Sequence, residues 1–193
     1  MQRTMKCAAA MGISMMLAAG MLFGQGMDKP SDNMSKKPVK ETKMSSADVN
    51  FLKDALQGGM FEVEAGKLAA TKATNDRVKE FGRLMEKDHG KADADLRQLA
   101  AKKNVTLPEK LGETDQGTYD RLSQMAGDDF TKEYIHLMVQ DHGNDISMFQ
   151  KISENANDPD VKAWARSLLP TLKKHLSQAK EISTSLEKTK KAM

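Results

Sequence analysis

The chain has a single cysteine and few aromatic residues. Aromatic side chains make up 5% of the 193 residues, and Val, Ile, Tyr and Trp are scarce beside Ala, Leu, Met, Lys and Glu. This composition favours helices over sheets. The cysteine, Cys7, lies in a first segment that we expect to be removed. Disulfides, thiolate chemistry and cysteine-ligated zinc are therefore excluded for the remaining chain.

Residues 1–26 have the pattern of a secretory signal peptide. MQRTMK is a short basic start, CAAAMGISMMLAAGMLF is apolar without a charge, and small residues follow at 18–20 and 24–26. We expect cleavage after about residue 20 or 26, and export to the periplasm or to an outer-membrane-associated position. An uncleaved membrane anchor is the alternative, because the apolar run is near the lower limit for a span.

The charge balance gives no support for nucleic-acid binding. Without residues 1–26, which carry Arg3 and Lys6, the chain has 28 basic and 27 acidic residues. Aromatic platforms on which bases could stack are missing as well. We therefore predict no nucleic-acid partner, and leave association with the envelope or outer membrane open.

The remaining chain divides by composition into three parts. Residues 27–45 contain two prolines, many charges and almost no large apolar side chain, which predicts a disordered linker. Residues 46–188 carry periodic apolar patterns and form the predicted domain. Residues 189–193 are a short basic tail that we expect to be solvated.

Four stretches of the domain have apolar residues spaced three or four apart, as in amphipathic helices. They run over residues 52–73, 78–99, 122–152 and 161–186. Ser46 or Asp48 is expected to cap the first, and the third has a potential break at Gly127-Asp128. Breaks are predicted near 74–76, in a long loop at 104–117 and in a turn at 154–160. The pattern predicts an all-α fold, an antiparallel four-helix bundle of about 140 residues.

Two segments of the chain repeat one motif. FGRLMEKDHG at 81–90 and YIHLMVQDHG at 134–143 both read aromatic-x-x-Leu-Met-x-x-Asp-His-Gly. Their histidines, His89 and His142, lie in register with the apolar positions of the second and third helices, and His175 does so in the fourth. His136 is out of register and is expected at the surface. Because each of the three lies near the middle of its helix, they are predicted to meet in one layer of the core.

Three converging imidazoles would suit a divalent transition metal such as Zn, Cu, Ni or Fe. Glu62 on the first helix and Glu86, three residues before His89, are the candidate carboxylate ligands. Asp88 and Asp141 precede their histidines by one residue and so point about 100° away. We expect them to hydrogen-bond to an adjacent helix or to another helix's imidazole, as outer carboxylates do around metal sites.

A structural role for the histidines is the alternative, since buried imidazoles with satisfied nitrogens also fix the register of a bundle. Met85 and Met138 are interpreted as core residues because thioethers pack well. No phosphate-binding glycine loop, Gly-x-Ser-x-Gly motif or nucleophile-base pair is present, so no catalytic residues are predicted.

The order of several motifs resembles the bacterial domain-of-unknown-function family 4142, whose members are often labelled outer-membrane proteins and placed among ferritin-like folds. The matching motifs are Glu62-Val63 with Gly66-Lys67-Leu68-Ala69, Met85-x-x-Asp88-His89, Leu96-x-x-Leu99-Ala100, Val105-x-Leu107-Pro108, Tyr134 with His142, and Leu169-Pro170-x-Leu172-x-x-His175-Leu176. The resemblance covers residues 46–186 and implies a ferritin-like four-helix bundle.

Ferritin-like di-iron proteins carry Glu-x-x-His on two of their helices. Here Glu86-x-x-His89 matches one such motif, but Leu172 and Val139 stand three residues before His175 and His142. The leading hypothesis is a non-enzymatic exported bundle that binds a metal ion or small ligand. A structural or stress-related interaction module is the second hypothesis, and a degenerate ferritin-like oxidoreductase the third.

Overall fold

The computed structural model describes residues 44–191, with side chains to residue 188. Within these residues five helices follow one another and belong to one compact unit. The predicted signal peptide, most of the predicted linker and the side chains of the basic tail lie outside this description. The helices are α1 (Ser46–Lys72), α2 (Asp76–Lys102), α3 (Glu113–Gln124), α4 (Gly127–Asn155) and α5 (Pro159–Lys191). The predicted all-α class is confirmed.

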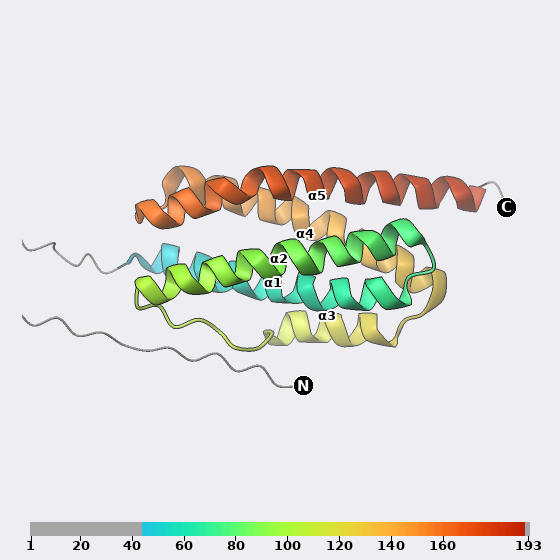
Figure 1. Cartoon of the computed structure of the whole chain (residues 1–193), viewed down its shortest axis with the longest axis horizontal. Coiled ribbons are helices and arrows are strands. Elements are labelled where there is room, and N and C mark those ends of the chain that lie inside the picture. Colours follow the sequence, from blue (N-terminus) through green and yellow to red (C-terminus); the bar gives the residue numbers. More distant parts are fainter. Residues whose placement is uncertain (1–43, 192–193) are drawn as a thin grey trace, which may run out of the picture. The chain divides into compact units, whose positions relative to one another are not determined.

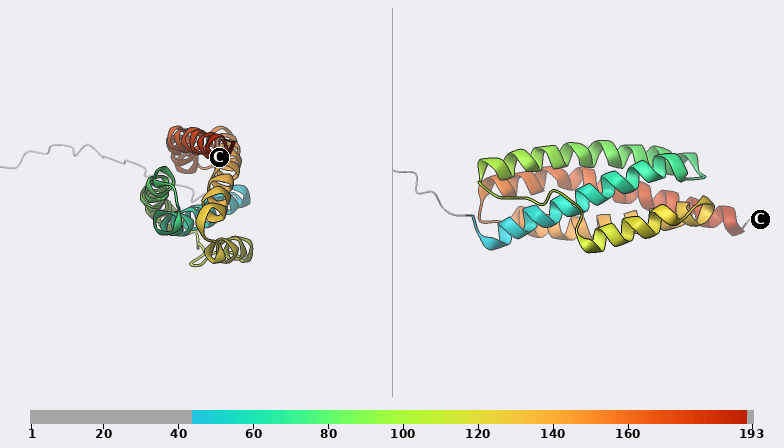
Figure 2. Two further views of the ribbon diagram at one scale, coloured as in Figure 1. Left: turned by 90° about the vertical axis from the view of Figure 1, so that its right-hand side faces the viewer. Right: turned by 90° about the horizontal axis from the view of Figure 1, so that it is seen from below.

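Short connections pair the four long helices into two hairpins. Residues 73–75 join α1 to α2, and residues 156–158 join α4 to α5. The members of each pair run side by side, and the end-on view shows the hairpins packed against each other (Figures 1 and 2). α3 lies outside them, mainly against α1.

The separate helix α3 corrects the sequence interpretation. Residues 113–117, predicted as loop, form its first part, and the predicted third helix is split at Met125 and Ala126, both extended. α3 has one buried side chain, Leu122, so its sequence carries almost no apolar periodicity. The chain turns into α4 through Gly127, whose φ of 61° is a conformation that glycine adopts without strain.

Polar side chains tie the ends of the helices together. The N-cap of α1 is Ser45, not the predicted Ser46 or Asp48. The Asp48 N–H donates to Ser45 Oγ over 3.1 Å. The buried Asp48 carboxylate accepts instead from the backbone N–H groups of Asn157 and Asp158, at 3.3 and 2.9 Å. Asp158 in turn caps α5, as predicted, by accepting from the N–H of Val161 at 3.2 Å.

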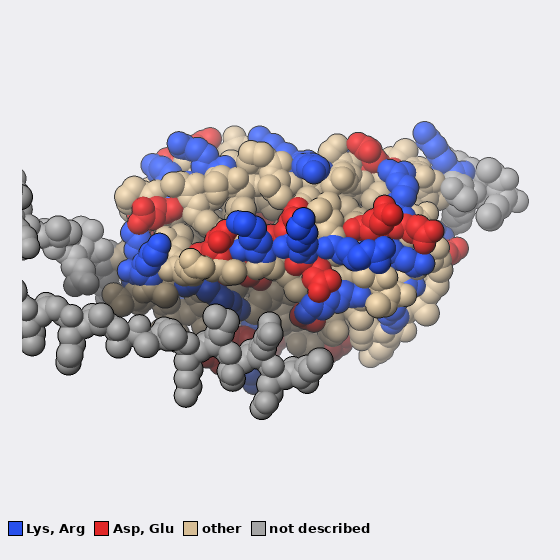
Figure 3. All heavy atoms as spheres, in the orientation of Figure 1, with Lys and Arg blue, Asp and Glu red and all other residues tan. Residues whose placement is uncertain are grey.

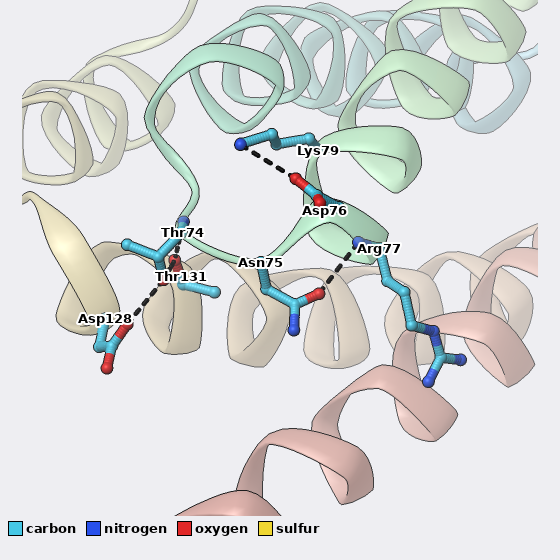
Figure 4. A network of polar contacts seen from close by, with 7 residues as sticks. All are labelled: Thr74, Asn75, Asp76, Arg77, Lys79, Asp128 and Thr131. Carbon is cyan, nitrogen blue, oxygen red and sulfur yellow. Dashed lines mark hydrogen bonds and ion pairs between the residues drawn. The ribbon is translucent and has the colours of Figure 1, made fainter.

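The opposite end of the hairpins is fastened at the α1–α2 turn (Figure 4). The Thr74 N–H donates to Thr131 Oγ1 over 3.0 Å, and the Thr74 hydroxyl donates to Asp128 Oδ1 over 2.6 Å. Asn75 caps α2 by accepting from the Arg77 N–H at 3.0 Å. The turn is thereby held to the start of α4.

The core consists of two apolar clusters at different heights. One is built around Phe81, Tyr134 and Met138, and the other around Leu52, Leu96 and Phe149. Along α2, α4 and α5, the residues of one cluster are followed by a buried histidine and then by residues of the other. On α1, Glu62 lies next to Phe61, where the cluster around Phe81 begins. This buried polar layer is where the predicted histidines lie.

The surface carries both signs of charge. On the face in Figure 3, basic and acidic side chains lie next to each other rather than in separate fields. Among residues 44–191, no helix combines the length and hydropathy that a membrane span requires.

Candidate metal centre

Each long helix contributes one buried polar side chain to the layer between the apolar clusters. Glu62 comes from α1, His89 from α2, His142 from α4 and His175 from α5. None of them is more than 7% exposed. Glycines 90 and 143, which follow two of the histidines, do not end their helices, so both rings project from the middle of a continuous helix.

The three imidazoles converge, as the sequence predicts. Their ring centroids are 5.3 to 5.4 Å apart in all three pairs. One ring nitrogen of each histidine lies within 4.8 Å of one from each of the other two. The histidines therefore share one height in the bundle.

The outer nitrogen of each ring contacts an oxygen. His175 Nε2 donates to Asp88 Oδ2 over 3.1 Å, and His142 Nδ1 donates to the Met138 carbonyl over 3.0 Å. His89 Nδ1 lies 2.7 Å from Glu62 Oε2. The first two contacts place the hydrogen of the neutral His175 and His142 rings on their outer nitrogens.

The inner nitrogens of His142 and His175 face each other, and with both ring hydrogens on the outer nitrogens each presents a lone pair. His142 Nε2 is 3.3 Å from His175 Nδ1. His89 Nε2 is buried and has no hydrogen-bond partner among the described residues. Glu62 Oε1 lies 3.2 Å from His142 Nδ1 but accepts no hydrogen bond within residues 44–191, because that N–H is directed at the Met138 carbonyl.

Burial controls the protonation of the layer. It lowers the pKa of His89 and of His142, and it lowers that of His175 to about 4, although the hydrogen bond to Asp88 acts in the opposite direction. Burial also raises the pKa of Glu62 to about 8, against the attraction of His142. The imidazoles are therefore neutral at pH 7, the form that binds metal ions.

Comparison with known proteins assigns the family. The pattern of DUF4142, a domain of unknown function, matches residues 33–182. The chain belongs to the DUF4142 family. A search of curated proteins gave no match.

Two solved structures share the fold of this DUF4142 chain. One is a DUF305 fragment from Deinococcus radiodurans, with a TM-score of 0.65 and 12% identity, covering 74% of this chain and 98% of that one. The other is a DUF305 protein from Streptomyces coelicolor that is proposed to be secreted. It has a TM-score of 0.62 and 13% identity, and the match covers 73% of this chain and 92% of that one. At these identities the likeness concerns the fold alone.

The sequence-predicted residues of this DUF4142 domain do not all reach the layer. Glu86 is exposed, because its position on α2 faces solvent rather than the bundle interior. His136 is also exposed, and Met85 and Met138 are fully buried in an apolar cluster. Asp141 contacts none of the three imidazoles by a hydrogen bond, and its buried Oδ2 is unpartnered within residues 44–191.

Two further carboxyl groups lie near the histidines, and neither was predicted as a ligand. Asp93 and Asp145 line a cavity together with His89 and His175, and burial raises their pKa values to about 6 and about 8. Asp93 is one helical turn after His89, and Asp145 is three residues after His142. That spacing is the signal that could have found them.

Proposed function

We propose that this protein binds one divalent transition-metal ion through His89, His142 and His175. One observation carries the proposal: each ring has one nitrogen close to an oxygen, and each offers a nitrogen that lies within 4.8 Å of nitrogens of the other two rings. Histidines that bind metals almost always donate their second N–H to a carboxylate, a carbonyl or water. Here His175 Nε2 donates to the Asp88 carboxylate and His142 Nδ1 to the Met138 carbonyl, while His89 Nδ1 lies 2.7 Å from Glu62 Oε2.

The spacing of one pair of nitrogens also fits an ion. Two nitrogens that each bind one tetrahedral ion at about 2.0–2.1 Å lie roughly 3.3–3.4 Å apart. The distance between His142 Nε2 and His175 Nδ1 is 3.3 Å. Without a cation or a shared proton, two facing lone pairs at this distance repel each other.

Nitrogen ligands narrow the choice of metal. Imidazole suits Zn, Cu, Ni and Fe, whereas Mg and Ca prefer oxygen ligands. In this assignment Glu62 and Asp88 orient the rings, and the exposed Glu86 takes no part. A di-iron centre is not favoured, because ferritin-like sites need four Glu with two His, and the layer holds one Glu with three His.

Metal analysis of the untagged protein tests the proposal. We expect one ion per chain in the wild type and none in His89→Ala, His142→Ala or His175→Ala. His136→Ala removes an exposed histidine and is the matched control, which should retain the ion. His142→Gln keeps a polar side chain of similar size in case the alanine variants unfold, and circular dichroism reports the fold of every variant.

A structural role of the same layer is the second candidate, favoured by the contacts that link four helices through Glu62, the imidazoles and Asp88. Absence of any metal from the wild type, together with lower unfolding temperatures in the three variants, would establish this role and overturn metal binding.

We further propose that the protein acts outside the cytoplasm, in the periplasm or at the outer membrane. The signal-peptide pattern of residues 1–26 supports this, as does the proposed secretion of a DUF305 protein that shares the fold. Mass spectrometry of the mature N-terminus, in fractionated cells, tests it. A chain that retains residue 1 in the cytosolic fraction would contradict it.

A further inference from the structure

A cavity lies directly beside the histidine layer. Its volume is about 30 Å³, and its lining includes Glu62, His89 and His175 but not His142. All four long helices contribute to its wall, which is apolar at Phe149, Trp164 and Leu172. The proposed metal site therefore borders this cavity at His89 and His175.

The polar part of this wall consists of carboxyl groups. Asp93 and Asp145 line the cavity and interact electrostatically with His89, whose Nε2 has no partner among residues 44–191. The Asp93 carboxyl is packed against Gly59 of α1, at the place where a β-carbon on that glycine would lie. Its position in the wall is thus set by the contact of α2 with α1.

The volume of the cavity limits what it holds. A buried water needs roughly 10–15 Å³ and two to four polar partners. The cavity meets both conditions, but it has no room for a large organic ligand. Three histidine ligands with a fourth position left for water are typical of exchangeable zinc sites, in contrast to closed structural sites with four protein ligands.

We propose that an ion held by His89, His142 and His175 keeps one coordination position open toward this cavity and binds a water molecule there. Asp93 and Asp145 accept the hydrogen bonds of that water. This inference rests on the proposed metal binding and adds that the ion exchanges small, hydrogen-bond-donating ligands of the size of water.

Copper(II) loading of the full chain tests the inference. Pulsed electron paramagnetic resonance in D₂O detects deuterons of a coordinated water, and water-proton relaxation measures its exchange; the zinc-loaded protein gives the diamagnetic baseline. We expect coordinated deuterons and relaxation well above that baseline in the wild type.

A cavity-filling pair of variants locates the water. Ala92 lines the cavity, whereas Ala94 on the same helix is exposed. Ala92→Val should keep one copper per chain but lose the signal of the coordinated water, and Ala94→Val should retain both. The deuteron measurement needs only the wild type, so it decides the question even if Ala92→Val fails to fold.

The outcomes separate this inference from the function on which it rests. If the wild type binds no copper, metal binding itself fails. If copper binds without coordinated deuterons, only the open position is overturned. Coordinated water that appears solely in Asp93→Asn or Asp145→Asn would also overturn it, because a carboxylate would then fill the fourth position in the wild type.

Discussion

Gly66 of α1 and Gly82 of α2 face each other at a close approach of the two helices. A β-carbon built on either glycine would lie 2.6 Å from the carbonyl oxygen of the other. Because that neighbour is backbone, a side chain at either position would force the helices apart. The contact lies one turn from Glu62, and so it helps to set the distance at which Glu62 meets His89.

We therefore expect Gly66→Ala to destabilise the protein by about 2 kcal/mol or more, because an added methyl group in a well-packed core forces costly shifts of the backbone and side chains. Gly58→Ala on the same helix is the matched control, because nothing lies within 4 Å of its β-carbon position. It should stabilise α1 by about 0.5–1 kcal/mol through helix propensity. Urea unfolding measures both; a neutral Gly66→Ala would contradict the close approach.

Asp88→Asn should weaken metal binding without removing a metal ligand. An asparagine side chain can donate to His175 Nε2, which would move the ring hydrogen to Nδ1 and block the inner lone pair. Loss of an outer hydrogen-bond partner typically lowers metal affinity by about 10–100-fold. Competition with a chromophoric chelator measures the affinity.

The control for this change is Asp95→Asn. Asp95 is on the same helix but pairs with Lys91 at the surface, so its variant should bind the metal like the wild type. Equal affinity in Asp88→Asn and the wild type would mean that Asp88 does not orient His175.

The histidine layer was predictable because register on an amphipathic helix fixes which side chains face inward. His89, His142 and His175 occupy apolar positions of their helices, and all three are buried. His136, out of register, is exposed. The helices α2 and α4 continue through Gly90 and Gly143, and the apolar pattern stays in phase beyond both glycines.

Periodicity could not decide which carboxylate joins the layer. Glu86 and Asp93 are three residues before and four residues after His89, so spacing along the helix favours neither. The contact of α2 with Gly59 of α1 directs the Asp93 side chain toward the cavity, while Glu86 stays exposed. Helix α3 was missed because it buries only Leu122.

Gln57 fastens the loop before α3 to α1. Its Nε2 donates to the Lys110 carbonyl over 2.9 Å, and its Oε1 accepts from the Gly112 N–H over 2.5 Å. Gln57→Ala should remove both bonds, at a cost of about 1–2 kcal/mol. Hydrogen exchange should then accelerate in residues 103–124 but not in the four long helices, because α3 lies outside the hairpins. Unchanged exchange there would refute the fastening role.

The pH dependence of stability in the metal-free protein should reflect the buried carboxyl of Glu62. Burial raises its pKa from 4.5 to about 8. Between these values the folded protein binds more protons than the unfolded chain, so the free energy of unfolding falls as the pH rises from 4.5 to 8. Glu62→Gln should flatten this decline. Asp145, whose pKa is also raised to about 8, maintains part of it.

The histidines act in the opposite direction and at lower pH. Burial lowers the pKa of His175 from 6.5 to about 4. The contribution of neutral His175 to the free energy of unfolding is therefore complete above pH 6.5 and is lost as the pH falls toward 4. Urea unfolding from pH 5 to 8 should therefore separate the two groups. Glu64→Gln, on the solvent side of α1, should retain the wild-type decline. If Glu62→Gln retains it as well, the Glu62 carboxyl is ionised in the folded protein at pH 7.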